Sequence, residues 1–539
     1  MIPTHRDVPG TVTALARSTA AMTALTAVSR VTGFVRILVV AAVLGTTYLG
    51  NTYQTANTVP NLLFELFAAG VLQAALIPTL VELLDGGRRD DAERVAGSVL
   101  GLAAVVLAGL AAVGMLAAPV IMRALVAGVS DPAVRQDQVE LGTVFLLFFL
   151  PQVVFYAGGM VATAVLNAHG RFALPMFAPV VNNVVVTASY ALFWWLRRDE
   201  GPSLDLSWSE IVVLAGGTTL GVVAFTAVPV VAVVRAGFSL RPRFDHRNEH
   251  VRRIARLGVW AAVFLAMSQV LLAVVLVLAN RVEGGVVAYQ VGFTFFLLPH
   301  ALFALPVLTA LFPDLSRRSQ TGDRAGFAAA VATGVRTIAF FVLPATAAFV
   351  VLARPLSRLA LFGETTAEGA EQVARVVAAF APGLLGYGAF LFLTRAFAAA
   401  GDTRTPALVH VGVTVVGGAL MVVGFAVAPM GWEVAAVAGA HAAAHLGGAA
   451  VLVALLRPRL ADALAGMVRA VAVTAVTAGA AGLVMFVVRS AVAGGGRIGG
   501  LTETLTGGIA GAAVYLALQW TAGGVRPGDI LARLRSEQR

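Results

Sequence analysis

Apolar stretches of about 20 residues recur along almost the whole chain, and a helix of that length crosses a ~30 Å hydrocarbon core. Of the 539 residues, 59% are hydrophobic and 12% are charged, a composition far from that of soluble globular proteins. The sequence therefore predicts an all-α polytopic membrane protein. We expect about fourteen transmembrane helices, near residues 19–46, 53–83, 95–126, 139–168, 172–196, 208–234, 254–279, 285–313, 325–353, 371–399, 406–428, 432–456, 464–488 and 499–520.

One spaced pattern, F-x-P-x4-Y-x6-T-x6-G-x4-P, occurs twice, at 149–175 and at 380–406. An internal repeat of this size indicates a duplicated architecture. Each half contains six spans. Because six is an even number, both halves enter the membrane from the same side, as in transporters built from parallel repeats. Such a design predicts a cavity between two six-helix bundles. The predicted parts are an N-terminal six-helix lobe, a C-terminal six-helix lobe, and two additional transmembrane helices with a cytoplasmic tail, at 1–242, 243–460 and 461–539.

The positive charges are distributed unevenly between the two sides of the membrane. The chain has no lysine, so all 38 basic residues are arginines, and most lie in the termini and the even-numbered loops. The positive-inside rule then places both termini in the cytoplasm. Nucleic acid is rejected as a partner, because these arginines flank spans in short loops and do not form a soluble basic face. Their simplest role is to fix topology and contact anionic lipid.

Two arginines lie inside the first span, Arg30 and Arg36. A guanidinium near the bilayer centre costs at least ~2.5 kcal/mol, so it normally faces a protein interior or a water-filled cavity and pairs there with an anion. The pair predicts an anionic cargo. The two residues are six positions apart, roughly 120° around a helix, so they face different directions unless Gly33 bends the segment.

The sequence shows no recognisable catalytic or metal-binding motif. It contains no cysteine, which excludes disulfides and thiolate sites. We find no plausible nucleophile, metal cluster or phosphate-binding Walker loop, so the chain is predicted not to be an enzyme and to need no cofactor or metal. Transport would then be driven by a gradient, by the membrane potential or by cargo supply.

Several segments resemble the MurJ/MviN family, which is similar in fold to multidrug and polysaccharide-lipid exporters. The resemblance covers essentially the whole chain. It implies a flippase that moves lipid II, the undecaprenyl-pyrophosphate-linked peptidoglycan precursor, from the inner to the outer leaflet of the bacterial cytoplasmic membrane. The segments are S-R-V-T-G-F-V-R at 29–36, V-P-N-L-L at 59–63, F-A-A-G at 67–70, F-L-P-Q-V-V-F-Y-A at 149–157 and N-A-H-G-R-F at 167–172.

This resemblance gives the intramembrane arginines a pyrophosphate to bind, since Arg offers planar bidentate donors to phosphate oxygens. It also implies membrane lipids and cell-wall synthesis proteins as partners. The family's usual further arginines, in the second and eighth spans, fall here on Phe64 and Thr294. Half of the usual cationic set is therefore missing.

Glu65 follows Phe64, and an acid at that depth needs a partner, which Arg30 or Arg36 would supply if either is mainly structural. Arg395, near the predicted cytoplasmic end of the tenth span, either adds a cation to the cavity or extends to the lipid headgroups. Other polar side chains either bind cargo sugars or bond between helices: Gln54, Asn57, Asn182, Asn183 and Gln290. Four histidines are either proton-coupling groups or packing residues: His300, His410, His441 and His445.

Two other functions stay open. One is a gradient-driven exporter of another amphiphile or a cationic drug, for which Glu65 would be the cargo or ion site. The other is a transport-inactive membrane scaffold for cell-wall machinery, which the missing arginines favour. Neutralising Arg30 or Arg36 separates these from the flippase.

Overall fold

The computed structural model describes residues 9–65, 70–244, 259–360, 362–460 and 463–521, and every regular element within them is a helix. These residues form two compact units. The first comprises 1–43, 55–123 and 136–262, and the second comprises 44–54, 124–135 and 263–539. The predicted lobe boundary at 242 lies beside residues 245–258, outside the described part, and the predicted tail falls largely on 522–539, also outside it. Both stay predictions.

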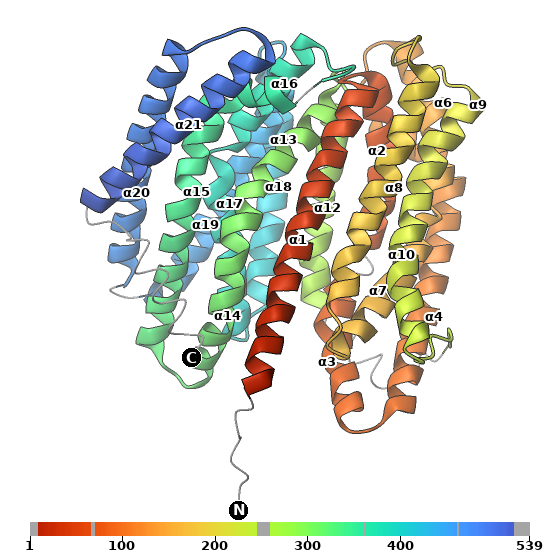
Figure 1. Cartoon of the computed structure of the whole chain (residues 1–539), viewed down its shortest axis with the longest axis vertical. Coiled ribbons are helices and arrows are strands. Elements are labelled where there is room, and N and C mark those ends of the chain that lie inside the picture. Colours follow the sequence, from red (N-terminus) through yellow and green to blue (C-terminus); the bar gives the residue numbers. More distant parts are fainter. Residues whose placement is uncertain (1–8, 66–69, 245–258, 361, 461–462, 522–539) are drawn as a thin grey trace, which may run out of the picture. The chain divides into compact units, whose positions relative to one another are not determined.

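The helices of the first unit run from red to yellow in Figure 1. Its longest helix, α1, continues without a break through the predicted first span. The elements are α1 (Pro9–Leu44), α2 (Tyr48–Phe64), α3 (Gly70–Asp85), α4 (Arg89–Leu116), α5 (Ala118–Leu125), α6 (Pro132–Phe149), α7 (Gln152–Ala168), α8 (Ala173–Arg197), α9 (Trp208–Ile211), η2 (Val212–Gly216) and α10 (Gly217–Arg235).

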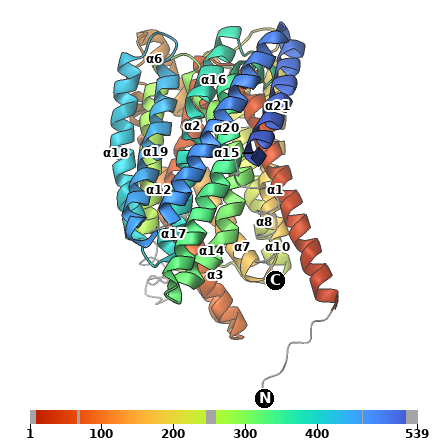
Figure 2. The ribbon, with the colours of Figure 1, turned by 90° about the vertical axis from the view of Figure 1, so that its left-hand side faces the viewer.

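The helices of the second unit run from green to blue. Figures 1 and 2 both show α20 and α21 side by side along α15, and these three helices pack against one another. The elements are α12 (Val259–Ala279), α13 (Gly285–Pro299), η3 (His300–Ala304), α14 (Leu305–Gln320), α15 (Arg324–Ala360), α16 (Ala367–Phe380), α17 (Gly383–Ala399), α18 (Arg404–Val427), α19 (Glu433–Leu460), α20 (Ala463–Ala491) and α21 (Gly496–Thr521).

The helical membrane fold is confirmed. Twelve helical segments of the described residues are long and apolar enough to cross a membrane, and a thirteenth span is formed if α16 and α17, which meet at 50°, are counted together. The remaining predicted span, 53–83, falls on α2 and α3, which are separated by residues 66–69 outside the described part. The count of fourteen therefore stays a prediction.

Both copies of the repeated pattern build the same local structure. Pro151 and Pro382 each precede a helix of 17 residues, α7 and α17. Proline suits this position because it lacks the N–H that a first helical turn leaves unpaired. Gly170 and Gly401 follow these helices with φ of 70° and 79°, a conformation that glycine adopts without a steric penalty. The repeat therefore encodes a helix break, a helix and a tight turn.

The first unit is held together by an apolar core between α3, α4, α7 and α10. Leu80, Val95, Val165 and Val233 are all buried in one cluster there. Small residues let the helices approach closely: a methyl group on Gly159 of α7 would lie 3.2 Å from the Thr226 hydroxyl of α10. Such packing of small residues is the usual way in which membrane helices associate.

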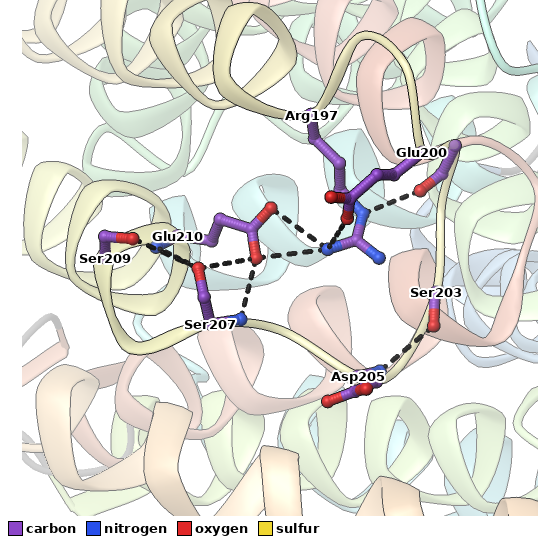
Figure 3. A network of polar contacts seen from close by, with 8 residues as sticks. Arg197, Glu200, Ser203, Asp205, Ser207, Ser209 and Glu210 are labelled. Carbon is purple, nitrogen blue, oxygen red and sulfur yellow. Dashed lines mark hydrogen bonds and ion pairs between the residues drawn. The ribbon is translucent and has the colours of Figure 1, made fainter.

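A buried ion pair closes the connection between α8 and α9 (Figure 3). The Arg197 Nη1 donates to both carboxylate oxygens of Glu210, at 3.0 and 3.1 Å, and the two side chains are 8% and 9% exposed. Arg197 Nε also donates to the Gly201 carbonyl. Ser207 caps α9, donating its backbone N–H to Glu210 Oε2 at 2.7 Å and accepting the Glu210 N–H with its hydroxyl. The pair therefore anchors both ends of this connection.

The start of α2 belongs to the second unit and is tied to it by Asn51. The Asn51 side chain is fully buried. Its amide donates to the Val282 carbonyl at 2.8 Å and accepts the Val286 N–H at 2.9 Å. One side chain therefore satisfies two backbone groups at the turn between α12 and α13.

We expect Asn51→Leu to lower the free energy of unfolding by about 2–6 kcal/mol, because two buried backbone groups lose their partner at roughly 1–3 kcal/mol each. Thermal unfolding of the purified protein in detergent measures this. The matched control is Asn61→Leu in the same helix, where the amide is exposed and bonds only to the Asn57 carbonyl. Equal loss of stability in both variants would contradict the anchoring role.

Candidate functional site

The two intramembrane arginines have different surroundings on α1. The Arg30 side chain is exposed and the Arg36 side chain is half-buried. This difference follows from their six-residue spacing, which turns them to different faces of one helix. Arg36 is therefore the one that the protein itself partly encloses.

Arg36 has no counter-ion in the part of the chain that the structure describes. Its Nε atom is buried without a hydrogen-bond partner, and none of the ion pairs includes it. It interacts electrostatically with the Tyr156 hydroxyl of α7. The Tyr156 ring packs on Phe64 at 5.0 Å between centroids and on Phe225 at 6.3 Å. A positive charge with aromatic neighbours is thus left available for an anion.

Polar groups of α8 lie against the same helix, one turn before Arg36. The Asn183 Nδ2 donates to the Thr32 hydroxyl at 3.1 Å. A methyl group on Gly33 would lie 3.5 Å from that same Nδ2 atom, which is an ordinary van der Waals distance. Asn183 therefore makes a bond between helices. The neighbouring Asn182 has a buried Oδ1 with no hydrogen-bond partner among the described residues. This oxygen packs against α10, where a methyl group on Gly221 would lie 2.7 Å from it.

Glu65 does not neutralise either arginine. Its side chain is half-buried at the end of α2, and it forms no ion pair with Arg30 or Arg36, all three being described residues. The ion pair that the sequence left open as the structural alternative is therefore not formed in this structure.

The other predicted cargo residues are divided between the two units. Asn57 belongs to the first unit, whereas Gln54, Gln290 and Arg395 belong to the second. Gln54 is buried, Asn57 and Gln290 are half-buried, and Arg395 is exposed. Their part in cargo binding stays a prediction.

Phe64 and Thr294, the two positions where the resemblance implied arginine, have packing or local roles here. The Phe64 ring packs on Tyr156 at 5.0 Å between centroids, with the two rings tilted by 39°. Thr294 donates its hydroxyl to the Gln290 carbonyl one turn earlier. Sequence reasoning missed Tyr156 as a neighbour of Arg36, although its place in the repeated pattern marked it as a structural position.

Three of the four predicted histidines gather in the second unit. His410, His441 and His445 line a cavity of about 200 Å³ together with Tyr289 and Tyr387. The Tyr289 hydroxyl lies 3.3 Å from His441 Nδ1, and the two imidazoles of α19 stack at 4.3 Å. Aromatic rings lie against all three histidines, and whether they couple protons or only pack stays a prediction. No group of three or more metal-ligating side chains is found among the described residues.

The comparison with known families decides the relationship. The family model for the lipid II flippase MurJ matches residues 40–505. The chain belongs to this family. It is 28% identical over 400 residues to the probable lipid II flippase MurJ of Vibrio cholerae, covering 73% of this chain and 74% of that protein. It is 30% identical over 392 residues to the probable lipid II flippase MurJ of Rhizobium meliloti, covering 72% and 71%.

Solved structures show the same fold. A lipid II flippase MurJ in an inward closed conformation superposes with a TM-score of 0.74 at 18% identity, covering 93% of this chain and 99% of that one. An inward-facing multidrug transporter of the MATE family superposes with a TM-score of 0.65 at 14% identity, covering 80% and 95%. The MurJ-family chain is therefore a multi-pass membrane protein with a transporter fold shared beyond its own family.

Proposed function

We propose that this chain is a flippase that moves lipid II from the inner to the outer leaflet of the bacterial cytoplasmic membrane by alternating access. Its membership of the MurJ family supports the cargo, and its relatives in Vibrio cholerae and Rhizobium meliloti are named as probable lipid II flippases. The uneven arginine distribution supports an orientation with both termini in the cytoplasm.

The observation that carries the proposal is the unpaired guanidinium of Arg36. A permanent charge within a span is unfavourable unless an anion meets it, and the described residues supply none. Lipid II carries a pyrophosphate between its sugar-peptide head and its polyprenyl tail. A guanidinium matches that group because it stays ionised and offers two parallel donors to phosphate oxygens.

The polar residues have separate tasks in this proposal. Arg36 binds the pyrophosphate and Arg30 adds a second positive charge along α1. Gln54, Asn57, Gln290 and Arg395 contribute further polar contacts to the headgroup.

No covalent bond is made or broken in this cycle, so the chain acts as a transporter and not as an enzyme. The driving force is a gradient, the membrane potential or cargo supply. Membrane lipids and cell-wall synthesis proteins are its expected partners.

Depletion of the gene in its host tests the function. We expect lipid II to disappear from the outer leaflet, because its transfer across the hydrocarbon core would lose its carrier, and we expect wild type to restore it. Accessibility of lipid II to an externally added probe is the measurement. Unchanged outer-leaflet lipid II after depletion would contradict the proposal.

A further inference from the structure

An arginine-lined cavity lies in the second unit. Its volume is about 400 Å³. The walls come from the end of α15, from the end of α20 with the turn after it, and from α21. The charged lining residues are Arg354, Arg358, Arg489 and Glu503.

The positive charges in this cavity outnumber the negative ones. Glu503 is its one carboxylate among the described lining residues; it is 3% exposed and accepts from Arg358 Nη1 at 3.3 Å. The Gly494 N–H also donates to Glu503, at 3.4 Å. That carboxylate is therefore already engaged, and it neutralises only one of the three guanidiniums.

Arg489 is the arginine without a carboxylate partner in the described part of the chain. It donates to the Val351 carbonyl of α15, and its guanidinium lies 5.5 Å from the centre of the Phe486 ring. A backbone carbonyl and an aromatic ring orient the side chain but do not neutralise it. Its remaining donors are available to an anion.

Arg354 contributes a second guanidinium to the cavity lining. It binds Glu371 of α16 with Nε at 3.0 Å and Nη2 at 2.8 Å. Glu371 is shared with Arg375, whose Nε lies 3.4 Å from the same oxygen. One carboxylate thus serves two arginines, so this edge of the cavity also keeps a surplus of positive charge.

Two of the helices that line the cavity, α20 and α21, also carry exposed apolar side chains. On α20, Leu483, Phe486 and Val487 are 70%, 51% and 65% exposed, and on α21 Leu505 is 52% exposed. Arg489 is in the last turn of α20, the position at which a membrane helix reaches the headgroup layer. The arrangement therefore combines an anion site with an adjacent surface for acyl chains.

We propose that the cavity between α15, α20 and α21 binds the phosphate headgroup of a membrane phospholipid, with the acyl chains lying on α20 and α21. A free anion would use the arginines alone, whereas a phospholipid uses both the arginines and the apolar faces. Guanidiniums pair with phosphate oxygens through parallel charge-assisted hydrogen bonds, and Arg489 has donors for them that meet no carboxylate among the described residues. The inference is independent of the proposed transport of lipid II.

The test is native mass spectrometry of the purified full-length chain in nonionic detergent, titrated with phosphatidylglycerol. We expect Arg489→Gln to weaken the first binding event by about tenfold, since charged hydrogen bonds of the usual strength are lost. Arg354→Gln should act in the same direction and should fold normally, because its side chain is 59% exposed. The matched control is Arg497→Gln, an exposed arginine in the first turn of α21 that lies over Phe362 and outside the cavity lining.

Two further probes identify the ligand source. Diacylglycerol with the same chains should bind more weakly than phosphatidylglycerol and should not distinguish the variants, because it lacks the phosphate. Inorganic phosphate should displace phosphatidylglycerol only at far higher concentration. Equal affinity for phosphatidylglycerol in wild type, Arg489→Gln and Arg354→Gln would overturn the site, and displacement by inorganic phosphate at concentrations similar to those of the lipid would overturn the phospholipid as its occupant.

Discussion

Replacing Arg36 with glutamine is expected to reduce lipid II transfer to the outer leaflet by about ten- to a hundredfold. The reason is that the half-buried guanidinium has no counter-ion among the described residues, so its charge is available to the cargo. Charged hydrogen bonds contribute roughly 1.5–3 kcal/mol, which corresponds to this range of rates if they form as the headgroup enters the membrane. Outer-leaflet lipid II in depleted cells that express the variant is the measurement.

Three comparisons make the Arg36 result specific. Arg36→Lys keeps the charge but loses the bidentate donors, so we expect partial activity. Arg198→Gln, which removes an exposed arginine paired with Asp199, should leave transfer unchanged. Full rescue by Arg36→Gln at wild-type expression would refute the assignment of this residue to the cargo, and full rescue by Arg30→Gln as well would leave the arginine pair without a transport role.

Replacing Glu210 with alanine is expected to lower the free energy of unfolding by about 3–5 kcal/mol. Removing one partner of a buried ion pair leaves the other charge uncompensated, which is more costly than losing an exposed pair. Here Arg197 would remain 8% exposed without its carboxylate, and the Ser207 N–H would lose its acceptor. Thermal unfolding in detergent, followed by size-exclusion chromatography, reports the change.

Glu200 provides the control for this pair, because it contacts the same arginine from the solvent side. Its carboxylate lies 3.5 Å from Arg197 Nη1 and its side chain is 68% exposed. Exposed ion pairs contribute about 0–1 kcal/mol, so Glu200→Ala should be nearly neutral. Similar losses in the two variants would show that the connection between α8 and α9 does not depend on the buried pair (Figure 3).

Much of the fold could be predicted because membrane helices are encoded locally. A span needs only a long apolar segment, and thirteen of the fourteen predicted segments fall on helices or on the bent pair that meet this criterion. The repeated pattern likewise predicted a recurring unit, since proline and glycine act on their own backbone. The span at 53–83 was harder to assess, because Pro60 and Pro78 lie within α2 and α3 and the segment between these helices is outside the described residues.

Side-chain partners could not be predicted in the same way. Asn182 and Asn183 are adjacent and chemically identical, yet Asn183 bonds to Thr32 while the Asn182 Oδ1 has no partner. Which of the two reaches Thr32 depends on how α8 is rotated about its axis, because consecutive residues of a helix point about 100° apart. From the sequence alone, both asparagines had the same two predicted roles, binding of cargo sugars or bonding between helices.

By itself, the sequence determined that this chain is a helical membrane protein with a duplicated design and two intramembrane arginines. Hydropathy, spacing and fixed charge are properties of the chain whatever its packing. Only the tertiary structure decided that Arg36 is partly enclosed without a counter-ion among the described residues, that Glu65 pairs with neither arginine, and that Arg354, Arg358 and Arg489 share one cavity. The physical reason is that the neutralisation of a charge depends on which distant helices approach it.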